Sequence, residues 1–174
     1  MAFGGGDTLL GLVALVDAAG GKIDGRVRIQ KEAFLLALAG APNLDPSRFS
    51  YHYYGPFSRS VSDSLQHAVL FGLLEEAREE FGDDQTRFAY KLTDQGRSWL
   101  IERPEGRLNR FKDKVSNLQR NHWRVLELAS TIAFLERRED IGGRDRAVEK
   151  ALNLKPECAH YEARARKLLA SLGL

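Results

Sequence analysis

Cysteine is nearly absent from this sequence, in which Cys158 stands alone. A single cysteine excludes an internal disulfide and a zinc site built from cysteines, and it fits a reducing compartment. Long apolar runs are lacking too, since no window approaches the roughly 18 apolar residues that a membrane-spanning helix needs. The first residues hold no basic cluster ahead of an apolar run, so we expect neither a signal peptide nor an anchor. We therefore expect a cytoplasmic protein with no membrane partner.

The motifs of common catalytic sites are also missing. The glycine-rich stretches at residues 4–7 and 20–22 lack the Gly-x-x-x-x-Gly-Lys-Ser/Thr spacing of a phosphate-binding loop. Cys158 and His160 are two positions apart, which places their side chains on different faces of a helix. His52 has no partner at ligand spacing, which favours an ordinary hydrogen-bonded histidine over a metal ligand or pH sensor. We expect no enzyme, no catalytic residues, no metal site and no cofactor.

Length and charge set the next limits. With 174 residues and 43% hydrophobic content, the chain can bury a core as one domain, or as one domain with an appendage. The net charge of +2 hides uneven blocks: residues 68–90 hold six acidic and two basic side chains, and residues 107–124 hold six basic and one acidic. A protein that binds DNA mainly by neutralising phosphates has a stronger basic bias. The charge pattern therefore permits nucleic acid as a partner without indicating it.

The first half of the chain reads as two helices separated by a short extended segment. Asp7 or Thr8 can cap a helix that ends at the Gly20-Gly21 pair. Residues 22–25 are too short for more than a turn or an edge strand. A second helix is predicted over residues 26–39, and residues 40–46 read as a loop.

The central segment predicts a helix followed by two strands. A Gly-Pro pair breaks any helix before Ser58, whose hydroxyl can cap a third helix over about residues 59–71. A strand then runs from Leu73 to Glu80, residues 82–84 supply a turn, and Phe88, Tyr90 and Leu92 alternate as a half-buried return strand does. These two strands form a wing behind the third helix.

The second half is predicted to be helical. Thr93 can cap a fourth helix, and residues 104–106 mark a linker. Apolar residues then recur at heptad-like positions through a basic helical stretch. Two short helices end the chain, and Pro156 stands at a first-turn position there. The heptad-like positions are Leu108, Phe111, Val115, Leu118 and Val125. The fold class is therefore mainly α with a small antiparallel β wing: a winged helix-turn-helix core at residues 1–103, plus a C-terminal helical extension at residues 104–174 for packing or dimerisation.

Four ordered motifs resemble a known family. They are Gly-Lys-Ile-Asp-Gly-Arg-Val-Arg-Ile-Gln-Lys at residues 21–31, Tyr-His-Tyr-Tyr-Gly-Pro-Phe-Ser at 51–58, Gly-Leu-Leu-Glu-Glu at 72–76 and Leu-Thr-Asp-Gln-Gly-Arg at 92–97. Over about residues 8–103 the chain is similar to the YwgA-type family of small bacterial and archaeal proteins. It is more distantly similar to the Panacea-type antitoxin domain. The resemblance implies a winged-helix-like core and a role in regulation or in neutralising a partner protein, and it brings no catalytic residues.

Two sets of side chains are candidates for binding DNA. The residues Arg59, Ser62 and Gln66 share one side of the third helix and suit guanine, phosphate and adenine contacts respectively. At the start of the second helix, Arg26, Arg28 and Lys31 either contact phosphates or pair with nearby acids. The acidic wing is the contrary feature, because in the usual docking mode its carboxylates would face phosphates. Either the wing points away, or the partner is not DNA.

The aromatic run before the third helix is the candidate site for a protein partner. Its rings, at Tyr51, Tyr53, Tyr54 and Phe57, either stack on bases or anchor a partner, or else pack under the helices. The basic stretch after residue 107 is either a second DNA-contacting surface or a dimerisation helix. We thus expect a DNA-binding transcriptional regulator, a homodimer through residues 107–135, with an antitoxin-like or adaptor-like protein-interaction module as the alternative.

Overall fold

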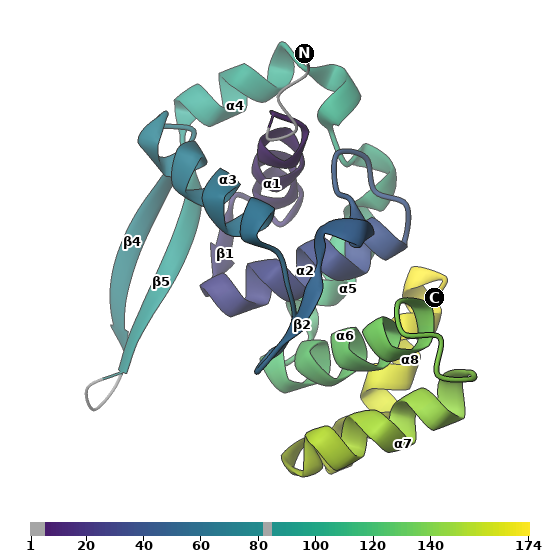
Figure 1. Ribbon diagram of the computed structural model, residues 1–174. Coiled ribbons are helices and arrows are strands. Elements are labelled where there is room, and N and C mark those ends of the chain that lie inside the picture. Colours follow the sequence, from purple (N-terminus) through teal and green to yellow (C-terminus); the bar gives the residue numbers. More distant parts are fainter. Residues whose placement is uncertain (1–5, 82–84) are drawn as a thin grey trace.

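The computed structural model describes residues 6–81 and 85–174, and it confirms a mainly α fold with a small antiparallel β wing (Figure 1). The first half consists of α1 (Gly6–Ala18), β1 (Lys22–Asp24), α2 (Arg26–Leu38), η1 (Pro46–Arg48), β2 (Ser50–His52), β3 (Gly55–Phe57), α3 (Arg59–Leu70), β4 (Leu74–Phe81), β5 (Gln85–Leu92) and α4 (Asp94–Ile101). The second half consists of η2 (Pro104–Gly106), η3 (Asn109–Phe111), α5 (Lys112–Arg120), α6 (Trp123–Arg137), α7 (Arg144–Leu154), η4 (Pro156–Tyr161) and α8 (Glu162–Leu172). The η elements are short 3-10 turns.

The predicted wing is the antiparallel pair of β4 and β5, which extends from the body of the molecule (Figure 1). Leu74 pairs with Leu92, and Glu76 pairs with Tyr90. Of the two alternatives for residues 22–25, a turn or an edge strand, the structure shows the strand: β1 adds to the other side of β5, where Ile23 pairs with Tyr90. Because the buried side chains of Tyr90 and Leu92 face the core, the wing is anchored at its base. The turn predicted at residues 82–84 lies outside the described residues.

Two of the predicted helix caps are confirmed and one is wrong. The hydroxyl of Ser58 accepts a hydrogen bond from the Val61 amide at 3.3 Å, and that of Thr93 accepts one from the Gly96 amide at 2.9 Å. The first helix begins at Gly6, so the predicted cap at Asp7 or Thr8 falls within its first turn. Thr8 is buried, and its hydroxyl accepts a hydrogen bond from the Ser60 hydroxyl of α3 at 3.2 Å. A packing contact therefore uses the hydroxyl that a cap would need.

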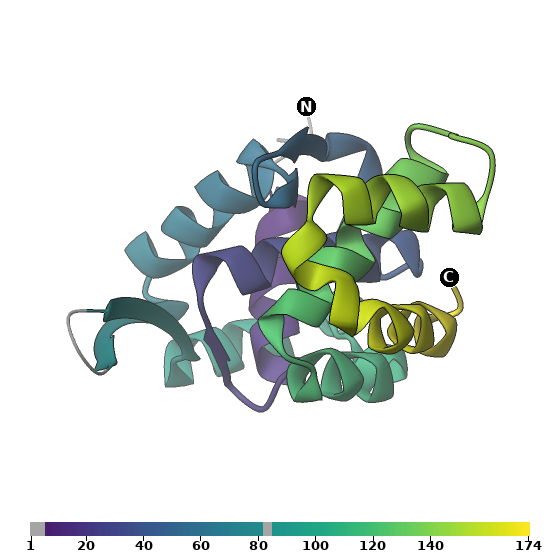
Figure 2. The same cartoon turned by 90° about the horizontal axis from the view of Figure 1, so that it is seen from below.

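Two buried helices, α2 and α6, form the centre of the molecule. Every residue from 29 to 37 in α2 and from 125 to 135 in α6 is buried. The helices contact each other, and α6 also contacts β3, α7 and α8. Figure 2 shows α7 and α8 on the side of α6 that faces away from α1. Apolar side chains from both halves of the chain belong to one core cluster. Within the described residues, no helix is long and apolar enough to span a bilayer.

The heptad-like stretch after residue 107 does not form one continuous helix. The chain is extended at Asn121, and His122 caps α6 by accepting a hydrogen bond from the Arg124 amide at 3.3 Å. Four of the five stripe side chains are buried inside the same chain, those of Leu108, Val115, Leu118 and Val125, and Phe111 is partly buried against the core. The stripe therefore serves packing, and its four buried side chains are not available to a second copy. A homodimer through residues 107–135 stays a prediction that this stripe does not support.

Candidate binding pocket

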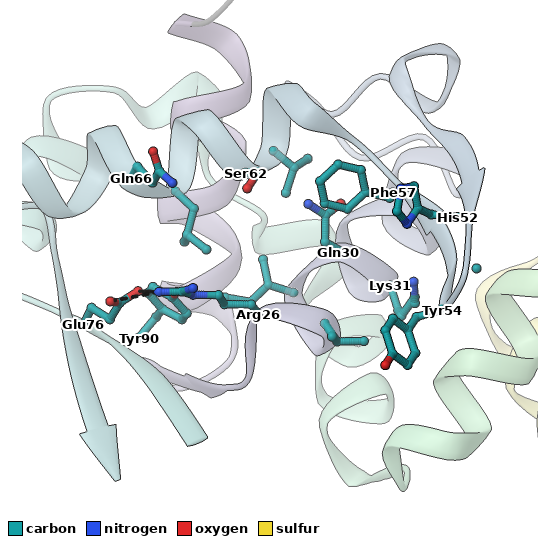
Figure 3. A pocket seen from close by; sticks show the side chains of 15 residues that line it. Arg26, Gln30, Lys31, His52, Tyr54, Phe57, Ser62, Gln66, Glu76 and Tyr90 are labelled. Carbon is teal, nitrogen blue, oxygen red and sulfur yellow. Dashed lines mark hydrogen bonds and ion pairs between the residues drawn. The ribbon is translucent and has the colours of Figure 1, made fainter. Parts of the chain in front are cut away.

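A pocket of about 260 Å³ lies between α2 and α3 (Figure 3). The β2–β3 hairpin borders one end, and the base of the wing borders the other. Its walls are largely apolar side chains, including Val27, Ile29, Val61 and Leu65, while polar groups stand at both ends. A concave apolar space with a few convergent polar groups is the usual form of a binding site.

Two consecutive residues of α2 fix the junction between the hairpin and α3. The amide of Gln30 donates to the Ser58 carbonyl at 3.0 Å, and its oxygen accepts from the Ser58 N–H at 2.9 Å. Next to it, Lys31 Nζ donates to the Pro56 carbonyl at 2.9 Å. Gly55 has a φ of 92°, and a Cβ there would lie 3.0 Å from Thr131 Oγ1. The Gln-Lys and Tyr-Gly-Pro motifs are thus neighbours in space, and together they build one wall of the pocket.

A second lysine holds the hairpin from the C-terminal half. Lys155 is 3% exposed, and its Nζ contacts the Tyr53 carbonyl at 3.2 Å and the Glu127 carboxylate at 2.7 Å. Lys31, also 3% exposed, lies in the same polar cluster. Burial, and then the positive charge of Lys155, lowers the pKa of Lys31 to about 8, although the Glu127 carboxylate acts in the opposite direction. Two buried ammonium groups, one from each half of the chain, therefore clamp the hairpin backbone.

The wing end of the pocket carries a different polar group. Arg26 forms an ion pair with Glu76 at 3.0 Å and donates to the Tyr90 hydroxyl at 2.8 Å, while its guanidinium lies 4.1 Å from the centre of the Phe88 ring. The hydroxyl of Tyr90 in turn donates to Glu76. Burial and this hydrogen bond raise the pKa of Tyr90 to about 12, so it is neutral. At this end of the pocket, the charges of Arg26 and Glu76 therefore neutralise each other.

The aromatic run is divided between the rim of the pocket and a contact with α6. The rings of Tyr54 and Phe57 line the pocket, and Tyr54 is 61% exposed. Tyr53 is 88% exposed. Tyr51 instead packs on Phe134, with 5.8 Å between ring centres. Tyr51 therefore packs against a helix, while Tyr53 and Tyr54 present large rings to solvent, and the role of these two rings in anchoring a partner stays a prediction.

The structure separates the three DNA-binding candidates of α3. Ser62 and Gln66 line the pocket, but Arg59 does not. The side chain of Arg59 is 86% exposed and lies 3.4 Å from Asp63, one turn along the same helix. Figure 3 shows Ser62 and Gln66 on the α3 wall of the pocket, opposite Arg26 on α2. The structure therefore brings two of the three candidates together on the pocket wall.

The candidates on α2 are engaged inside the molecule. Arg28 pairs with Glu32 at 2.9 Å and donates to two backbone carbonyls at the end of α5, which leaves its side chain 15% exposed. Arg26 pairs with Glu76, and Lys31 is buried under the hairpin. For both arginines the interpretation as partners of nearby acids describes the contacts seen.

Eight of the residues that line the pocket carry no signal of their own in the sequence that marks them as part of a site. These residues are Val27, Ile29, Gln30, Gly55, Val61, Leu65, Glu76 and Tyr90. A helix such as α2 that is buried all round has no polar stripe to mark its functional side. One signal was present, because the Gln-Lys pair precedes the Tyr-Gly-Pro segment in the motifs that carry the family resemblance.

The side chains of Glu127, Glu157 and Cys158 hold ligand-type atoms within 4.8 Å of one another. The carboxylate of Glu127 is already engaged by Lys155 at 2.7 Å and by Arg124 at 3.2 Å. Burial, and then the charge of Glu127, raises the pKa of the Cys158 thiol, so the thiol is protonated. A metal ligand or nucleophile needs the thiolate, and this cluster favours the opposite form.

Comparison with known proteins gives one informative similarity. No protein-family model matches this sequence. The chain is 27% identical over 124 residues to a protein of Bacillus subtilis (strain 168) named as uncharacterized protein YwgA, and the match covers 69% of this chain and 70% of YwgA. This similarity supports the predicted relationship to the YwgA-type proteins.

Proposed function

We propose that this chain is a non-enzymatic protein-interaction module, of the antitoxin or adaptor kind, which binds a segment of a partner protein in the pocket between α2 and α3. The observation that carries the proposal is the pocket of about 260 Å³ itself, with apolar walls and exposed tyrosine rings at its rim. Tyrosine side chains offer a large contact area at a small entropic cost and are frequent anchors in protein interfaces. The YwgA-type resemblance implies a role in regulation or in neutralising a partner protein, and the second of these is of this class.

The order of elements supports a winged-helix-like core for this module. Three helices and a three-stranded sheet follow one another as α1, β1, α2, α3, β4 and β5, with the strands arranged β1-β5-β4. In a winged helix the third helix precedes the wing, as α3 does here. The β2–β3 hairpin is an addition between α2 and α3. Because it stands against α2, it converts the groove between the helices into a bordered pocket.

The charges around α3 favour a protein partner over DNA. The cations of α2 are engaged by Glu76, by Glu32 or by the hairpin carbonyl, and the first strand of the wing exposes the carboxylates of Glu75 and Glu80. Phosphate-directed binding depends on many unpaired cations on one face. A largely apolar pocket with few unpaired cations around it suits a protein segment better.

A site-specific crosslinking experiment tests the proposal. A photoreactive phenylalanine analogue replaces Tyr54 at the pocket rim, and in a control chain it replaces the exposed Lys150 of α7. We expect a single adduct of defined mass from the first position and none from the second. The change Val27→Trp, at a pocket residue that is 43% exposed, should block the adduct. Leu154→Trp, at a site 49% exposed outside the pocket, should not. Equal adducts in all variants would refute the proposal.

A DNA-binding regulator is the second candidate, because Arg59 is 86% exposed at the start of the helix that precedes the wing. This function predicts duplex binding that weakens steeply with salt and that Arg59→Ala abolishes without changing the fold. Gel-shift titrations with random and genomic duplexes at low salt test it, with the 260/280 nm absorbance ratio of fresh protein as a check for co-purifying nucleic acid. An intact protein that ignores these duplexes refutes this candidate.

A further inference from the structure

We infer that the pocket recognises a partner segment in which a large apolar side chain lies next to a carboxylate, with the carboxylate bound at Lys31. This inference rests on the proposed protein-interaction function and names the chemistry of the segment. Its basis is that Lys31, a buried lysine, is among the residues that line a largely apolar pocket.

The hydrogen bonds of Lys31 leave room for a ligand. An ammonium group has three N–H donors, and the Pro56 carbonyl accepts from one of them at 2.9 Å. The residue is 3% exposed, so bulk water solvates it poorly. A buried charge is costly unless another charge or several hydrogen bonds compensate for it. An acceptor brought in by a ligand would supply this compensation.

The charges around Lys31 are unbalanced. Glu127 from α6 faces Lys31, but its carboxylate already pairs with Lys155 at 2.7 Å and with Arg124 at 3.2 Å. Glu157 pairs with Arg124 at 3.4 Å. This cluster therefore holds three cations and two carboxylates, so one positive charge is in excess. The net charge predicts an anionic group as the ligand of Lys31.

The remaining pocket determines the rest of the ligand. At the wing end, Arg26 and Glu76 neutralise each other, and Tyr90 is neutral. Between the ends the walls are largely apolar, with the polar side chains of Ser62 and Gln66 on the α3 side. A pocket of about 260 Å³ is slightly smaller than the roughly 300–1,000 Å³ of typical small-ligand sites, so it suits one large side chain and a carboxylate. The hairpin end also contributes His52 and Tyr54, whose ring atoms can pack on that side chain.

Matched small probes test the charge requirement directly. The probes are 3-phenylpropionate and 3-phenylpropionamide, which share an apolar body and differ in charge, titrated at pH 7 against the full chain by amide NMR. We expect shifts at residues of α2, β3 and α3, and an affinity for the carboxylate at least fivefold higher than for the amide. Equal affinities, or shifts elsewhere on the chain, would overturn the inference.

Two variants assign the preference to Lys31. Lys31→Gln keeps a donor for the Pro56 carbonyl but removes the charge, so we expect it to bind both probes equally. Arg120→Gln removes an exposed cation of α5 outside the pocket and should retain the fivefold preference. A folded Lys31→Gln protein that still prefers the carboxylate would overturn the inference.

The pH dependence of wild-type binding gives a second measurement, which does not require any variant to fold. The pKa of Lys31 is about 8, so its charge is present at pH 7 and lost as the pH rises to 10. The preference for the carboxylate should therefore disappear over this range, while the affinity for the amide stays constant. The other groups facing this end are His52, Tyr54, Glu127 and Lys155. A preference unchanged at pH 10 would overturn the inference.

A peptide arm distinguishes a protein segment from a free organic acid. The blocked dipeptide acetyl-Phe-Glu-amide should bind more tightly than acetyl-Phe-Gln-amide, and Lys31→Gln should abolish the difference. Binding of 3-phenylpropionate without any binding of the dipeptides would assign the pocket to a small acid and refute the partner segment. The crosslinking experiment at Tyr54 tests the proposed function independently of this inference. If Tyr54 forms the adduct but the pocket does not prefer the carboxylate, this inference is refuted and the proposed function is not.

Discussion

The replacement Gln30→Met tests whether the link between α2 and α3 is essential for the fold. Gln30 is 7% exposed, and its two hydrogen bonds with the Ser58 backbone are 3.0 Å and 2.9 Å long. Methionine has a similar volume, so the change removes hydrogen bonds without leaving a large cavity. The Ser58 carbonyl keeps a bond from the Ser62 amide at 3.2 Å, so the loss falls mainly on the buried Ser58 N–H.

The expected loss follows from these contacts. A buried donor left without a partner costs about 1–3 kcal/mol, and losing the second bond adds about 1 kcal/mol, so we expect a decrease of about 2–4 kcal/mol in the free energy of unfolding. Urea unfolding followed by circular dichroism measures it. The control is Gln95→Met, because Gln95 makes a comparable 3.0 Å bond to the Phe71 carbonyl at an exposed position. If Gln30→Met destabilises no more than this control, the reasoning about the buried link is refuted.

Three further changes test other contacts by the same assay. Burial raises the pKa of the Glu32 carboxyl to about 7 in the folded protein. As the pH rises, the unfolded chain loses this proton first, so the free energy of unfolding falls between about pH 4.5 and pH 7. Glu32→Gln should remove this decrease. Gly96→Ala should destabilise by more than about 2 kcal/mol, because its Cβ would lie 2.1 Å from the Leu73 carbonyl oxygen. Lys155→Met should cost about 3–5 kcal/mol, because it removes a buried partner of Glu127. A loss of less than about 1 kcal/mol in the free energy of unfolding of Gly96→Ala or Lys155→Met would contradict the role of that contact. An unaltered pH dependence in Glu32→Gln would contradict the role of Glu32.

Local signals explain what could be predicted from the sequence. Ser58 and Thr93 are good caps whatever the rest of the chain does, because the bonds they accept come from amides three residues on. The alternation of Tyr90 and Leu92 marks a half-buried strand in the same local way. The helix and wing that follow the Tyr-Gly-Pro segment were therefore predicted with nearly the observed boundaries.

The pocket could not be predicted because contacts between distant segments build it. Gln30 meets Ser58 across 28 positions, and Lys155 meets Tyr53 across 102. The burial of Lys31 and Lys155 could not be predicted from the residue type, because lysine is almost never fully buried without a partner. The break at Asn121 was missed for a related reason: α5 and α6 both bury apolar residues at helical spacing, so the heptad-like pattern continues across the bend.

The clamp on the hairpin links the two halves of the chain to the proposed function. Lys31 from the first half and Lys155 from the second contact backbone carbonyls of the hairpin, at Pro56 and Tyr53 respectively. Because the clamp uses carbonyls, the rings of the hairpin tip are free to contact a partner while the backbone beneath them is fixed. A carboxylate bound at Lys31 would add the missing negative charge to this clamp. Binding would therefore stabilise the contact between residues 1–103 and 104–174. The larger rise in melting temperature that 3-phenylpropionate gives over 3-phenylpropionamide should be lost in Lys31→Gln.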